Sequence, residues 1–179
     1  MPTIPSDDAS GTEGRLDHMS AADRTPTLED AIVLAAYWHR GQTYPSVRGE
    51  PFILHPLRVM AQVESDVERI VAVLHDVLED TACTLGDLRR LGYSERVIEA
   101  LDRLTHRDGD AYETYIERIK DDPLARQVKL ADLADNLANN RRIAEVASGT
   151  EVRERILRYE RAIAQLRAAA AAAHAEPPM

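Results

Sequence analysis

The chain has 179 residues, enough for one domain with a hydrophobic core and few for two. Its formal net charge of −9 argues against a general nucleic-acid binder, because phosphate contacts need an excess of Lys and Arg. A small anionic ligand is still compatible with this charge, because its binding depends only on the charge of its own pocket. The single cysteine, Cys83, excludes an internal disulfide framework, and no apolar stretch approaches the roughly 20 residues of a membrane span, so we expect a cytoplasmic protein with no membrane partner.

The first part of the chain is polar. Residues 1–24 are rich in Ser, Asp, Gly, Thr and Pro without apolar periodicity, which predicts a disordered leader. Thr25 followed by Pro26 has the form of a helix cap with proline at the first helical position, and this helix should end near Gly41. A loop then leads to Pro56, where a second helix should begin.

Helical patterns continue to the C-terminus, and none of the intervening segments alternates as a strand would. A buried helix capped by Asp66 should run to Thr81. Further helices are predicted at 85–91, 95–104, 112–120, 122–142 and from 150 onward. The alanines at 168–173 have more helical propensity than packing value. The sequence therefore predicts an all-α fold, a single bundle of about seven or eight helices. Its domain should span 25–167, before an Ala-rich C-terminal tail at 168–179.

Residues 75–81, HDVLEDT, follow the apolar run IVAVL at 70–74 and are the most informative part of the sequence. A helix this apolar should be buried, and a buried imidazole beside three carboxylates is costly unless these groups are paired or bind a metal ion. At about 100° per residue, the four polar side chains cover an arc of roughly 140° on the predicted helix. One face of a core helix is therefore predicted to carry out chemistry.

His75 and Asp76 offer the imidazole and carboxylate ligands that suit a divalent metal in a phosphate-hydrolysing site. They diverge by about 100° on a helix, so an ion between them needs ligands from other helices. The candidates are His55, at a loop-to-helix junction, and Asp132, beside the packed face of its helix. Alone, each is more often structural: a histidine next to a proline, or a solvated helix edge.

Glu79 and Asp80 lie one turn after the His-Asp pair, on the same predicted side of the helix. Carboxylates facing a metal-bound water suit general acid or general base catalysis. The alternative is an exposed last turn, where the helix dipole disfavours acidic residues. We therefore expect Glu79 and Asp80 to be catalytic.

Four separated motifs together resemble a known family. They are GQ at 41–42, GEPFILHPL at 49–57, LHDVLEDT at 74–81 and VKLAD at 128–132, in the order expected of HD-domain hydrolases of the RelA/SpoT type. That family includes small alarmone hydrolases, which remove the 3′-pyrophosphate of guanosine tetra- and pentaphosphate (ppGpp) using manganese. The resemblance covers residues 28–142, most of the chain predicted to be ordered.

The resemblance implies an HD domain that holds one Mn²⁺ ion. Its implied ligands are His55, His75, Asp76 and Asp132. Glu79 and Asp80 are similar to the pair that positions and activates the attacking water, and Asn136 matches an asparagine that contacts substrate. Lys129 belongs to a matched motif and is the first candidate for holding phosphate. The implied partner is a small phosphorylated nucleotide, attacked at phosphorus by metal-bound water; the oligomeric state stays open.

Several positions differ from the family pattern. The arginine that typically follows Gly-Gln and helps hold the nucleobase is not found there, and Tyr44 could stack on a base instead. Leucine follows Asp132 where the family has arginine, Asp135 stands where it has histidine, and Asn139 where it has threonine. The metal ligands are retained while the substrate-contacting residues differ, so the base preference stays open.

We expect a manganese-dependent phosphohydrolase of ppGpp-type alarmones, with two rivals. The same chemistry could act on another phosphorylated nucleotide, such as an adenine alarmone or a phosphorylated dinucleotide cofactor. A non-catalytic, metal-containing nucleotide sensor is the second rival, although a sensor has no need of the water-activating pair Glu79 and Asp80. A purely structural bundle leaves the acidic face of the buried helix unexplained.

Overall fold

The computed structural model describes residues 25–46, 48–107, 109–147 and 149–175; the leader predicted at 1–24 lies outside them. In these ranges the regular structure is helical, apart from an isolated antiparallel bridge between Thr43 and Pro51. The prediction of an all-α bundle is therefore confirmed. None of the helices described is long and apolar enough to cross a membrane.

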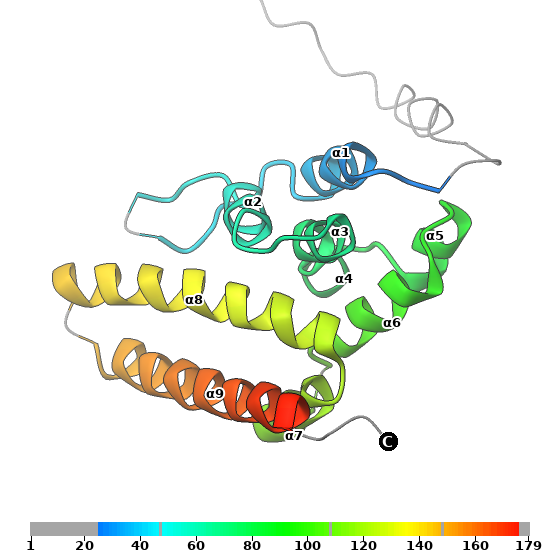
Figure 1. Ribbon diagram of the computed structural model, residues 1–179. Coiled ribbons are helices and arrows are strands. Elements are labelled where there is room, and N and C mark those ends of the chain that lie inside the picture. Colours follow the sequence, from blue (N-terminus) through cyan, green and yellow to red (C-terminus); the bar gives the residue numbers. More distant parts are fainter. Residues whose placement is uncertain (1–24, 47, 108, 148, 176–179) are drawn as a thin grey trace, which may run out of the picture.

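The helices, drawn in Figure 1, pack around the central helix α3 (Asp66–Leu74). They are α1 (Leu28–Trp38), α2 (Leu54–Met60), α3 (Asp66–Leu74), α4 (Val77–Asp80), α5 (Leu85–Arg90), α6 (Glu95–Leu104), α7 (Tyr112–Lys120), α8 (Pro123–Val146) and α9 (Thr150–Ala175). Helix α3 contacts α1, α2, α6 and α8, and the long helices α8 and α9 run antiparallel beside each other. Helix α7 packs against both of them.

The apolar run at 70–74 makes α3 the centre of the core, because every residue in it is buried. The helix begins with a capping box in which the Ser65 side chain accepts from the Glu68 backbone and Glu68 reaches back. The predicted cap at Asp66 is wrong by one residue. The first helix also begins differently: its cap is Thr27, paired reciprocally with Asp30, in place of Thr25 and Pro26.

The predicted helix from 66 to 81 is wrong in one respect that matters for the site. Helix α3 ends at Leu74, and the chain turns at His75 and Asp76 before α4 begins. The His75 ring donates from Nδ1 to the Ala72 carbonyl over 2.7 Å, and such a side-chain bond competes with continued helical bonding. The split produces nine helices in the described ranges and removes the regular 140° arc that a continuous helix implies.

Other boundaries shift by a few residues. Helix α2 begins before Pro56, α8 continues to Val146, and α9 continues through the alanines to Ala175. The predicted tail therefore starts as helix, and the domain boundary at 167 stays a prediction. Cys83 is buried in the core, and burial raises the pKa of its thiol to about 11, in keeping with an ordinary packed residue.

Candidate metal and active site

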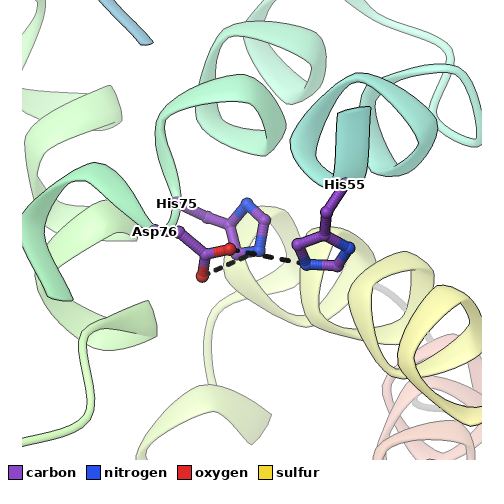
Figure 2. A group of neighbouring side chains, drawn as sticks. All are labelled: His55, His75 and Asp76. Atoms are coloured by element: carbon purple, nitrogen blue, oxygen red, sulfur yellow. Dashed lines mark ion pairs between the residues drawn. The ribbon is translucent and has the colours of Figure 1, made fainter. Parts of the chain in front are cut away.

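The four predicted metal ligands come together where α2, α8 and the turn between α3 and α4 meet. The His55 Nε2 atom lies 3.4 Å from an Asp76 oxygen and 3.2 Å from an Asp132 oxygen. His75 Nε2 lies 3.1 Å from Asp76 and 3.6 Å from Asp132. Figure 2 shows the two rings and the Asp76 carboxylate pointing toward one another. One ligand atom of each residue lies within 4.8 Å of those of the other two. The His55, His75 and Asp76 group could therefore hold a metal ion.

Both imidazoles have their Nδ1 atom occupied. His75 donates to a backbone carbonyl, and His55 Nδ1 lies 2.7 Å from Asp135 Oδ2, which can only accept. Each neutral ring therefore keeps its Nε2 lone pair for the shared space between them. The Nε2 atom of His75 is buried and has no hydrogen-bond partner among the described residues. A bound cation would satisfy this orphaned atom, so the donor set fits a metal.

The charges of the site are strongly coupled. Burial lowers the pKa of His55, but hydrogen bonds to Asp132 and Asp135 outweigh it and raise the pKa to about 10. Burial likewise opposes ionisation of Asp132, yet the Lys129 charge and the two histidines hold the pKa of this carboxyl well below its usual range. The carboxylates therefore favour positive charge between the two rings. A metal ion would supply this charge.

Lys129 and Asn136 both contact Asp132 from neighbouring turns of α8. The Lys129 ammonium lies 2.8 Å from Asp132 Oδ2, and the Asn136 amide donates to Oδ1 over 2.5 Å. Burial lowers the pKa of Lys129, but the attraction of Asp132 raises it well above its usual value. Both residues also line the cavity described next, so their predicted contacts with substrate stay open.

A cavity of about 680 Å³ is lined by three of the four candidate ligands, His55, Asp76 and Asp132. Glu79 and Asp80, at the end of α4, also line this cavity, and their catalytic role stays a prediction. Glu79 accepts from the His106 backbone amide over 3.1 Å, and Gln42 donates to the Asp80 carbonyl over 3.0 Å. Burial, together with the negative charges of Asp76 and Glu79, raises the pKa of Asp80 to about 6. Asp80 is therefore able to exchange a proton near neutral pH.

Tyr44 is placed by the loop between α1 and α2. The loop closes on itself because Tyr44 N donates to Glu50 O over 2.8 Å, and Gly49 adopts a positive φ of 62° beside that pairing. The Tyr44 ring stacks on His55 with centroids 4.6 Å apart, and its hydroxyl donates to Asn136 over 2.8 Å. Tyr44 therefore supports the candidate metal site; stacking on a nucleobase stays a prediction.

The outer wall of the cavity includes residues that the sequence analysis did not select. Helix α7 contributes Tyr112, and α9 contributes Arg158 and Tyr159. The Arg158 guanidinium lies over both rings, 4.9 Å from the Tyr112 centroid and 5.8 Å from that of Tyr159. Arg158 forms no ion pair with the described carboxylates. Helix α9 lies beyond the four motifs. The only sequence signal for this part of the wall is the adjacent pair Arg158 and Tyr159 on a predicted helix.

Comparisons with known proteins place the chain in a family, although no protein-family model matches it. It is 33% identical over 145 residues to the GTP pyrophosphokinase of Streptomyces coelicolor, covering 74% of this chain and 17% of that one. It is 34% identical over 129 residues to the bifunctional (p)ppGpp synthase/hydrolase SpoT of Escherichia coli, covering 64% of this chain and 18% of that one. The chain thus spans less than a fifth of these relatives.

A shorter relative decides the family. The guanosine-3′,5′-bis(diphosphate) 3′-pyrophosphohydrolase MESH1 of Danio rerio is 31% identical over 125 residues, which are 65% of this chain and 69% of that protein. The chain belongs to the RelA/SpoT family of HD-type hydrolase domains. A solved structure described as a metazoan ortholog of SpoT that hydrolyses ppGpp has the same fold, with a TM-score of 0.65 and 22% identity over 80% of this chain and 87% of that one. The family and fold implied by the four motifs are confirmed.

Proposed function

We propose that this member of the RelA/SpoT family is a manganese-dependent phosphohydrolase that removes the 3′-pyrophosphate of ppGpp-type alarmones. One observation carries the proposal: the Nε2 atoms of His55 and His75 converge with the carboxylates of Asp76 and Asp132 beside a cavity that Glu79 and Asp80 line. The names of the relatives support the substrate class, because MESH1 of Danio rerio is named for this hydrolysis.

Different residues of the chain would bind the metal ion, position the water and bind the phosphate. His55, His75, Asp76 and Asp132 would hold the ion, which when bound supplies a Lewis acid and lowers the pKa of a water molecule. Glu79 and Asp80 both border the cavity, where they would orient a water molecule. Burial raises the pKa of Asp80 to about 6, so Asp80 would be the group that accepts the proton of this water. Charge on the transferring phosphoryl group is offset from the wall by Lys129 and Arg158, which line the cavity on α8 and α9.

A pair of variants tests the proposal. Pyrophosphate release is measured with Mn²⁺ from ppGpp and from a panel of adenine and dinucleotide phosphates, alongside Mn²⁺ binding by equilibrium dialysis. Asp76→Ala should lose both binding and turnover. Glu79→Gln should retain Mn²⁺ and lose about 10²–10⁴-fold in kcat, the contribution of a positioned general base.

The outcomes separate the rivals. Turnover of a different nucleotide, with the same response to both variants, would keep the chemistry and replace the substrate. Mn²⁺ binding without turnover of any phosphorylated nucleotide would overturn the proposal in favour of a sensor. Equal turnover by wild type and Glu79→Gln would remove Glu79 from the catalytic step.

A further inference from the structure

Asp135 approaches His55 from the side of the ring opposite the candidate metal position. Its Oδ2 atom accepts from His55 Nδ1 over 2.7 Å, and the two side chains are 10% and 2% exposed. Asp135 lies three residues after Asp132 on α8, so one helix contributes carboxylates to both nitrogens of the same imidazole. This arrangement leaves His55 little freedom to rotate.

Arg58 in turn holds Asp135. Its Nε atom donates to Oδ1 over 2.7 Å and its second terminal nitrogen donates to Oδ2 over 3.1 Å, which is a two-point fork. The remaining terminal nitrogen of Arg58 lies 2.7 Å from Glu50 in the loop before α2. The order of contacts is therefore His55, Asp135, Arg58, Glu50, running from the metal position outward.

The two histidines are supported differently. His75 donates to the neutral carbonyl of Ala72, whereas His55 donates to a carboxylate and stacks on Tyr44. A carboxylate on the distal nitrogen fixes the tautomer and makes the other nitrogen a better electron donor than a carbonyl does. Of the two histidines, His55 is therefore the one whose affinity for a metal ion should depend on a charged partner, Asp135.

We propose that Asp135, fixed by Arg58, is a positioning residue that aims His55 Nε2 at the metal. The proposal rests on the metal site of the proposed function. It concerns a feature of this chain, because the family pattern has histidine where Asp135 stands. Removing Asp135 should weaken metal binding through His55 without touching Asp132 or the ligands His75 and Asp76, which lie in the turn between α3 and α4.

The test is Mn²⁺ affinity of the full chain, measured by electron paramagnetic resonance titration. Asp135→Ala should raise the Kd by about 10–100-fold, the usual effect of removing a partner of this kind. Asp135→Asn keeps an oxygen that can accept from Nδ1, so it should raise the Kd by less than Asp135→Ala does. Arg58→Ala should give an intermediate loss, because Asp135 remains but is no longer held in place.

A surface pair provides the matched control. Arg89 forms the same fork with Glu95, with Nε to Oε1 at 2.9 Å and a terminal nitrogen to Oε2 at 3.2 Å, and neither residue lines the cavity. Glu95→Ala and Arg89→Ala should leave Mn²⁺ affinity unchanged. Thermal unfolding of each variant shows whether the chain is folded at the temperature of the titration.

Failure of this inference is distinct from failure of the proposed function. If Asp76→Ala abolishes binding but Asp135→Ala binds Mn²⁺ like wild type, the site stands and the positioning role is overturned. If wild type binds no Mn²⁺, both fail. If Asp135→Ala does not fold, Asp135→Asn and Arg58→Ala decide, and wild-type affinity in both overturns the role.

Discussion

The floor and the outer wall of the cavity are built in different ways. The floor is the cluster of candidate ligands: His55, Asp76 and Asp132 line the cavity, and His75 contacts the two carboxylates. The wall is formed by side chains such as Arg158, which is exposed and held by aromatic rings. Changes in the wall therefore cost little stability, whereas changes in the floor disturb buried charge. Under the proposed function, the reaction would therefore depend on the buried floor and substrate choice on the exposed wall.

The largest effect is expected at the floor, from Asp132→Ala. This carboxylate is 4% exposed and contacts Lys129, which is 14% exposed, as well as both imidazoles. Removing one partner of a buried ion pair costs about 3–5 kcal/mol, because the other charge stays buried without compensation. Urea denaturation should show this loss, together with loss of Mn²⁺ binding. Asp132→Asn, which keeps a polar partner, should be less destabilised, and wild-type stability of Asp132→Ala would contradict the structure of the floor.

Removal of the metal should have the next largest effect. A ligand at 100 times its Kd stabilises the folded chain by about 2.7 kcal/mol. A chelator should therefore lower the Tm of the Mn²⁺-loaded wild type and leave that of Asp76→Ala unchanged. Arg158→Ala, a wall variant, should respond to the chelator as wild type does. A smaller response in Arg158→Ala would show that the wall takes part in holding the ion.

The sequence predicted the floor better than the wall, for physical reasons. Charged residues directly after the buried apolar segment at 70–74 are improbable without a function, and the remaining ligands lie in the motifs shared with the family. All four predicted ligands are brought together. The break after Leu74 was not predicted; it coincides with a bond from the His75 ring to the Ala72 carbonyl, which hydrophobic periodicity does not reveal.

The wall could not be predicted because its residues meet only through tertiary packing. Arg158 and Tyr112 lie on separate helices, and each alone looks like a solvated charge or a packed aromatic residue. Asp135 was noted only as a departure from the family pattern, and its contact with His55 spans 80 residues of sequence. Local spacing carries no information about such pairs.

The wall itself is tested by Arg158→Ala. A charge-assisted hydrogen bond to phosphate contributes about 1.5–3 kcal/mol, so we expect KM for the phosphorylated substrate to rise by about 10–100-fold. Stability should change by no more than about 0.5 kcal/mol and Mn²⁺ affinity should not change. Arg161→Ala, at an exposed arginine on the same helix outside the cavity lining, is the matched control. An unchanged KM in Arg158→Ala would place substrate binding elsewhere.

The smallest effect is expected from Tyr44→Phe. This variant tests whether Tyr44 belongs to the floor, which binds the metal ion, or to the wall, which binds the substrate. Burial raises the pKa of Tyr44, so its hydroxyl stays protonated and donates to Asn136, whose amide in turn donates to Asp132. Phenylalanine keeps the stack on His55 but frees the Asn136 oxygen, a loss of about 1 kcal/mol for one neutral hydrogen bond. If the bond from Tyr44 to Asn136 positions Asn136 for the substrate, kcat/KM should fall about fivefold and Mn²⁺ affinity should not change. If it orients Asn136 for Asp132, Mn²⁺ affinity falls by the same factor, and the floor then extends through Asn136 to the loop that carries Tyr44.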